Sequence, residues 1–179
     1  MENHIHINIF DFDETLFRVP GYTCKEAKGI TPYDWFDSPE SLSPEFNIRA
    51  ILNTCEQTQA QPDVLSFLIT HRVKACQERV LEILRDNGGI LFDKTFFLGR
   101  ESAKAEVALK LIRTHEANSI TIFEDSLWEI IKYTEAFLDA GLMIDIEFIF
   151  VDKSRVITIA WETARSIAEL SQIEKLSIQ

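Results

Sequence analysis

Short hydrophobic runs alternate along the chain with longer stretches in which hydrophobic residues recur at helical spacing. This alternation predicts an α/β protein, in which helices cross over the faces of a mainly parallel sheet. The runs are rich in Ile, Phe and Val, as is typical of strands covered on both sides. We expect strands over residues 4–10, 64–69, 95–98, 120–123 and 147–151.

The stretches between and after these strands predict amphipathic helices. Their hydrophobic residues fall on one stripe of a helix, and the first helix is expected to end at Gly88 and Gly89. The expected helices cover residues 73–87, 102–114, 127–140 and 161–175.

Residues 18–62 interrupt this alternation. The segment holds all five prolines of the chain, the aromatic residues Tyr33, Trp35 and Phe36, and an expected helix over 44–58. It lies between the first two strands and is longer than most connections in compact domains. We therefore expect a small lid, inserted into a single domain that spans residues 1–179.

Composition and charge narrow the classes of protein. The chain has 179 residues, of which 46% are hydrophobic, and a formal net charge of -11. That charge disfavours an extended nucleic-acid surface or an anionic membrane as a partner. Cys24, Cys55 and Cys76 match neither a disulfide framework nor a CxxC metal site. Since there is also no signal peptide pattern and no apolar run long enough to span a membrane, we expect a cytoplasmic protein.

Two aspartates directly follow the first predicted strand, at the edge where α/β sheets bind ligands. Residues two apart in an extended segment point to the same side, so Asp11 and Asp13 can face one metal ion or one substrate. With Glu14, three acids lie within four residues, and this crowding favours a nearby cation. The alternative is an acidic turn that ends the strand.

Three later segments place polar side chains at the ends of predicted elements. Thr70 follows the second strand, Lys104 lies in the first turn of a helix, and Glu124 and Asp125 follow the strand over 120–123. A cation in the first turn of a helix is unfavourable unless an anion lies nearby. Taken singly, these residues also fit a turn, a solvated lysine and a polar strand end.

In this order the segments resemble the four motifs of the haloacid dehalogenase (HAD) superfamily of phosphotransferases, whose first motif, DxDxT, is matched from Asp11 to Thr15. The resemblance extends from about Ile5 to Gly141. It implies a three-layer α/β/α Rossmann-like fold, with Asp11 as the nucleophile and Asp13 as the general acid and base. The implied reaction is the hydrolysis of a phosphomonoester through an aspartyl phosphate.

The resemblance also implies Mg²⁺ as the cofactor, held by Asp11, the backbone carbonyl of Asp13 and Asp125, while Thr70 and Lys104 hold the phosphoryl oxygens. The fourth motif of the family usually has paired Asp or Gly-Asp. This chain has Glu124 before Asp125, with Glu129 four residues further on. We include Glu124 among the candidate metal ligands.

A narrower resemblance is to the Swiss Army Knife RNA repair-like branch of this superfamily. That branch commonly has Leu-Thr-Gly-Arg in its second motif, and an Arg and a His often follow its acidic pair. This chain has His71 in place of the Gly, Ser126 in place of the Arg and Glu129 near the place of the His. The resemblance rests on residues 35–36, 39–42, 69–72, 91–93 and 123–125.

The expected substrate is a phosphorylated small molecule or a nucleic-acid end. Arg72, Arg18 and His71 are candidates for binding the rest of it, because guanidinium groups pair with phosphate at two points. Ordinary surface ion pairs are the alternative for the two arginines. Trp35 and Phe36 either stack on a base or sugar or pack the lid against the sheet.

Two other functions and one other site are considered. The first is a catalytically weak HAD-like phosphate-binding or regulatory module, which the intact Asp11 and Asp13 disfavour, while the irregular fourth motif leaves room for it. The second is a phosphoacceptor receiver domain, which is disfavoured because receivers phosphorylate an Asp at a middle strand. His4 and His6 alternate on the first strand and resemble a two-histidine metal site, but they lie at the strand end opposite Asp11, which favours a structural role.

Overall fold

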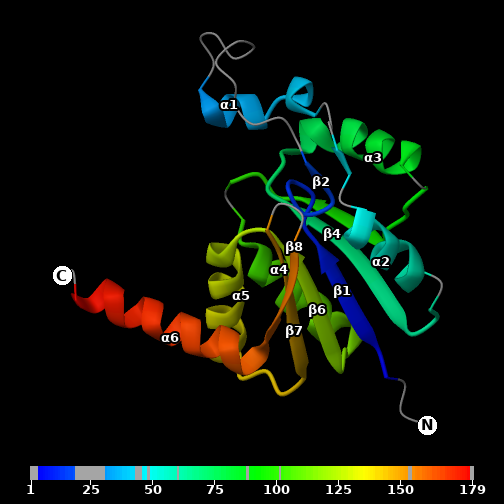
Figure 1. The fold of residues 1–179 in the computed structure, drawn as a ribbon. Coiled ribbons are helices and arrows are strands. Elements are labelled where there is room, and N and C mark those ends of the chain that lie inside the picture. The colour runs from blue at the N-terminus through cyan, green and yellow to red at the C-terminus, as the bar shows by residue number, and fades with distance from the viewer. Residues whose placement is uncertain are drawn as a thin grey trace.

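The computed structural model describes residues 4–18, 31–42, 46–47, 49–59, 61–87, 89–100, 102–152 and 155–177. A six-stranded sheet with the strand order β5-β4-β1-β6-β7-β8 lies at its centre (Figure 1). The parallel strands are β1 (His6–Phe10), β4 (Val64–Thr70), β5 (Lys94–Phe97), β6 (Ser119–Glu124) and β7 (Asp145–Asp152). The edge strand β8 (Arg155–Ala160) runs antiparallel to β7.

Helices cover the sheet on both sides (Figure 1). One side carries α2 (Arg49–Gln59) and α3 (Gln77–Asp86), which follows the 3-10 turn η2 (Lys74–Cys76). The other side carries α4 (Lys104–His115), α5 (Leu127–Asp139) and α6 (Trp161–Ser177). The predicted three-layer α/β/α architecture is therefore confirmed. Within the described part of the chain, no helix is both long and apolar enough to cross a membrane.

The remaining described elements lie in the segment after β1. They are β2 (Phe17–Arg18), α1 (Pro32–Phe36), η1 (Pro39–Ser41) and β3 (Phe46–Asn47), which pairs with β2. Within the predicted insertion 18–62, α2 packs on the sheet through Ile51, Leu52 and Cys55. Residues 19–30, 43–45, 48 and 60 lie outside the described part, so the lid stays a prediction.

The five predicted strands and the helices after them are present, but the helix expected over 44–58 begins only at Arg49, since Phe46–Asn47 forms β3, and β8 was missed. Its residues run from the end of β7 almost directly into α6, and no turn signal separates them from that helix. Val156 and Ile157 on this edge strand are exposed. A short run with this pattern resembles a connection more than a strand that is buried on both faces.

The central strand β1 contributes to both layers of the core. Ile7 and Ile9 pack toward α4 and α5, whereas Phe10 packs toward α2 and α3. Phe10 also stacks on Phe123 of β6, with ring centroids 4.3 Å apart. Alternate residues of a strand face opposite sides of the sheet, so this packing fixes the register of β1 and the position of the residues that follow it.

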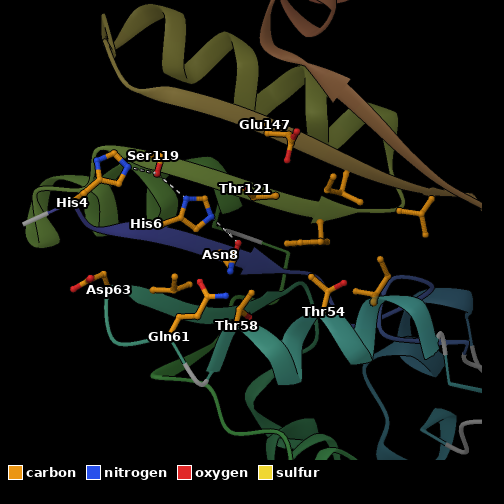
Figure 2. Close-up of a pocket in the computed structure, with 15 residues that line it drawn as sticks. His4, His6, Asn8, Thr54, Thr58, Gln61, Asp63, Ser119, Thr121 and Glu147 are labelled. Carbon is orange, nitrogen blue, oxygen red and sulfur yellow. Dashed lines mark hydrogen bonds between the residues drawn. The ribbon is translucent and has the colours of Figure 1, made fainter.

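A groove of about 730 Å³ opens on the α2 side of the sheet, at the end of β1 where His4 and His6 lie (Figure 2). His6 hydrogen-bonds with Ser119 Oγ at 2.7 Å and with Asn8 Oδ1 at 3.0 Å. Among the described residues, no third metal-ligating side chain joins the two histidines. The contacts of His6 are therefore those of a structural residue, and the groove is separate from Asp11.

We expect Ile122→Ala to lower the free energy of unfolding by about 2–5 kcal/mol, because it leaves a cavity in the middle of the sheet. Ile122 on β6 is fully buried. Ile157→Ala on the exposed β8 is the matched control and should cost less than about 1 kcal/mol. Urea unfolding of both variants measures the difference, and equal losses would contradict the described core.

Candidate active site

The candidate site lies where the carboxyl ends of three neighbouring parallel strands meet. β1 lies between β4 and β6, and the backbone N–H of Asp11 donates to the carbonyl of Phe123 at 3.0 Å. The residues that follow β1 and β6 are therefore neighbours. The chain then turns at Glu14, whose φ of 56° is in the left-handed region, and the Glu14 N–H donates to Phe17 O at 2.8 Å.

Lys104 joins two of the acidic residues in a buried ion-pair cluster. Its Nζ lies 2.8 Å from Asp11 Oδ1 and 2.7 Å from Glu124 Oε2, and the residue is 3% exposed. Burial alone would lower the pKa of Lys104, but the two carboxylates outweigh burial and raise it well above its ordinary value. Lys104 is the first residue of α4, where a cation is unfavourable without a nearby anion. Asp11 and Glu124 are those anions.

Three carboxyl groups crowd around this lysine. One oxygen each of Asp11, Glu124 and Asp125 lies within 4.8 Å of the others. Burial raises the pKa of Asp11 and of Glu124 to about 7 each, against the opposing effect of Lys104. Burial likewise raises the pKa of Asp125 to about 6, while a hydrogen bond with Glu124 lowers it. One ammonium cannot balance three ionised carboxylates, so the cluster lacks positive charge.

The donor set fits a hard divalent cation, because carboxylate oxygens are the ligands that Mg²⁺ prefers. Glu124 already uses Oε2 for Lys104, and its Oε1 accepts the N–H of Ser126 at 3.3 Å. Asp11 uses Oδ1 for Lys104. The second oxygen of Asp11 and the carboxylate of Asp125 are thus better placed than Glu124 to hold an ion, and Glu124 orients Lys104.

Arg72 holds the side chain of Asp13. Its Nε lies 2.9 Å from Asp13 Oδ2 and its Nη2 lies 2.6 Å from Oδ1, which is a two-point pair. Arg72 is 2% exposed and also donates to the carbonyl of Phe36 and, at 2.5 Å, to Ser41 Oγ. One guanidinium therefore connects Asp13 to α1 and η1, and Arg72 is neither exposed nor part of a surface ion pair.

The other predicted site residues lie near these groups or at the surface. Thr70 is buried at the end of β4, where its Oγ1 accepts the backbone N–H of Arg72 at 3.1 Å. Arg18 lies 3.5 Å from Glu14, and both side chains are exposed. Exposed pairs of this kind contribute little to stability. The substrate-binding roles of Arg18, Arg72 and His71 stay predictions.

Sequence reasoning missed a contact between His71 and Glu129. Their Nε2 and Oε1 atoms lie 3.5 Å apart, and Glu129 also accepts from Lys132 at 2.7 Å. The hydrogen bond with Glu129 raises the pKa of His71. Burial would raise the pKa of Glu129, but His71 and Lys132 outweigh it and lower that pKa to about 2. Two of the three residues that depart from the RNA repair-like pattern, His71 and Glu129, are thus partners. Their joint departure is the signal that could have indicated the contact.

Comparison with known proteins identifies the fold. The sequence matches no protein-family model and no curated protein. The structure resembles a chain of the Pnkp1/Rnl/Hen1 complex, with a TM-score of 0.51, 12% identity, and coverage of 85% of this chain and 48% of that one. It also resembles the class C acid phosphatase from Bacillus anthracis with tungstate bound, with a TM-score of 0.50, 16% identity, and coverage of 77% and 62%.

The chain thus spans about half to three fifths of the length of these two proteins. Both have the haloacid dehalogenase fold, which confirms the fold expected from the order of the sequence motifs. At these identities the likeness establishes the fold alone.

Replacing Arg72 tests the link between Asp13 and the segment over 31–42. We expect Arg72→Met to lower the free energy of unfolding by about 2–3 kcal/mol, because it leaves the Asp13 carboxylate without its ion-pair partner. This expected loss is smaller than for a fully buried pair, since the Asp13 side chain is 26% exposed. Arg113→Met, on the exposed face of α4, is the matched control. Equal urea midpoints for the two variants would refute the role of this ion pair.

The acidic cluster predicts that stability depends on pH and on Mg²⁺. Burial raises the pKa of Asp11 and Glu124 from 3.8 and 4.5 to about 7. Their contribution to stability is therefore full below about pH 4 and is lost as the pH rises through 7 when no metal is added. Thermal unfolding should show this loss, and Mg²⁺ should raise the melting temperature more at about pH 8 than at about pH 6.

Asp125→Asn should reduce this stabilisation by Mg²⁺, because it removes a candidate ligand and one of the crowded charges. Asp139→Asn, at the exposed end of α5, is the matched control and should keep the full effect. An unchanged Mg²⁺ effect in Asp125→Asn would show that the ion binds elsewhere.

Proposed function

We propose that this protein is a magnesium-dependent phosphohydrolase that cleaves a phosphomonoester through an aspartyl phosphate on Asp11. The observation that carries this proposal is the position of Asp11, which is bonded to Lys104 and clustered with Asp125 at the end of the central strand. Such a cluster joins a nucleophile, a fixed positive charge and oxygen ligands for a metal.

In this reaction an oxygen of Asp11 attacks phosphorus while the bond from phosphorus to the leaving oxygen breaks. Asp13 gives a proton to the leaving oxygen and then takes one from the water that hydrolyses the aspartyl phosphate. Thr70 and Lys104 hold the phosphoryl oxygens, so charge is stabilised by groups that are already in place. Bound Mg²⁺, held by Asp11, Asp125 and the carbonyl of Asp13, would neutralise negative charge and favour the ionised nucleophile.

The proposed substrate is a phosphorylated small molecule or a nucleic-acid end. One structural neighbour belongs to the Pnkp1/Rnl/Hen1 complex and the other is an acid phosphatase, and the latter supports phosphate esters as a class. The net charge of -11 supports recognition of a chain end over an extended nucleic-acid surface. The segment over 31–42 contacts Arg72 beside Asp13, which supports a lid role for part of residues 18–62.

One observation favours a second candidate function, a phosphate-binding or regulatory module with little turnover. Arg72 bonds both oxygens of Asp13. A general acid must direct one of its oxygens to the leaving group, so for fast catalysis Asp13 would have to release one oxygen from Arg72. If both oxygens stay bonded to Arg72, the site would bind phosphate without rapid hydrolysis.

The first experiment measures release of phosphate from an aryl phosphate with Mg²⁺. Asp11→Asn should lower the rate by at least about 10³-fold, because it removes the nucleophile. Asp63→Asn, in the loop at the opposite ends of the strands, is the matched control and should keep the rate. Full activity of Asp11→Asn would reject the proposed mechanism.

The same assay separates the candidates for function and substrate. A panel of phosphorylated metabolites and of oligonucleotides with 3′- or 5′-phosphate should show activity confined to one class. Phosphate binding without turnover on every substrate would favour the module over the enzyme.

A further inference from the structure

His71 connects the end of β4 to the loop before α4 and to the first turn of α5. It follows Thr70 at the end of β4, and its Nδ1 lies 2.9 Å from the carbonyl oxygen of Gly99, in the loop before α4. Its Nε2 lies 3.5 Å from Glu129 Oε1 on α5. The imidazole therefore joins the end of β4, which carries Thr70, to the loop that leads to Lys104 and to the helix that follows Asp125.

The partners of the ring determine its protonation. A backbone carbonyl only accepts, so the Nδ1 that faces Gly99 carries a proton. Nε2 faces a carboxylate, which favours a second proton and hence the imidazolium. Glu129 keeps its own bond to Lys132 at 2.7 Å, so it remains paired when the imidazolium turns to another anion.

The ring also differs in accessibility from the groups around it. The side chain of His71 is 39% exposed, whereas that of Glu129 is 11% exposed and that of Lys104 is 3% exposed. Lys104 lowers the pKa of His71 against the stronger effect of Glu129, so the two positive groups interact across the site. An anion that enters beside Thr70 would meet both of them.

We propose that protonated His71 is an anion-binding residue of this site, which turns its Nε2–H from Glu129 to an oxygen of the bound phosphoryl group. This inference rests on the proposed function only in that the site binds a phosphoryl group. It assigns a third donor beside Thr70 and Lys104.

Anion binding by His71 should depend on pH. The charged groups that face His71 are Glu129, backed by Lys132, from α5 and Lys104 from α4, and the Gly99 carbonyl faces it from the preceding loop. The hydrogen bond to Glu129 raises the pKa of His71 above 6.5. The anion-binding form is thus complete below the pKa of His71 and disappears as the pH rises through it.

The test uses sulfate, a tetrahedral dianion that keeps its charge over the range studied and that the site cannot hydrolyse. The full chain with Mg²⁺ is titrated from about pH 5.5 to about pH 8.5 while NMR follows its four histidines. Sulfate should raise the pKa of His71 by about one unit. By linkage, sulfate should then bind about tenfold more tightly to the protonated form.

Three variants make the result specific. His71→Gln should lose this dependence of sulfate affinity on pH, and Glu129→Gln should move it to lower pH, which loss of a merely structural contact would not do. His115→Gln, at the far end of α4 against Phe67, should behave as the unmodified chain.

An absent sulfate complex, or a pKa of His71 that sulfate leaves unchanged, would overturn the inference even if His71→Gln does not fold. Because sulfate is not turned over, the two proposals fail separately. A chain without phosphatase activity that still shows the linkage loses the proposed function alone, whereas an active phosphatase with an unresponsive His71 loses this inference alone.

Discussion

The candidate site depends on the buried ion pairs that the Lys104 ammonium makes with two carboxylates. Lys104 bonds Asp11 after β1 and Glu124 at the end of β6, two buried carboxylates that would otherwise repel each other. Removing one partner of a buried charge cluster leaves the rest uncompensated, so these three residues act as a unit. The sheet supplies the frame, because the Phe10 and Phe123 rings stack one residue before the two carboxylates.

Residues at the ends of strands could be predicted from the sequence because that placement follows from topology. Asp11, Thr70 and Asp125 each follow a hydrophobic run, and parallel strands bring such residues to one edge of a sheet. The contact of Lys104 with acids followed from the cost of an isolated cation at a helix start. The backbone pattern was enough for these inferences, since they concern which elements meet and not where side chains point.

Contacts between side chains of different loops could not be predicted in the same way. Arg72 faces Asp13, and His71 faces Glu129, across 59 and 58 positions of the chain respectively. The adjacent residues His71 and Arg72 thus have different partners. Which partner each one faces depends on the local turn and on the side-chain rotamers. The antiparallel β8 was missed for a related reason, since an exposed edge strand lacks the doubly covered pattern on which the other assignments relied.

Charge balance sets the order in which the site can be filled. With Asp11, Glu124 and Asp125 ionised, Lys104 leaves two negative charges in excess, and an approaching phosphoryl dianion would add to them. In the proposed function a divalent cation would remove the excess, so its binding would accompany or precede that of the substrate. Lys104 is already shared between two carboxylates, and its capacity for a further anion is limited. In the proposed function, further positive charge for the substrate would come from a group outside the cluster, and the anion-binding role proposed for the half-exposed imidazole of His71 would supply it.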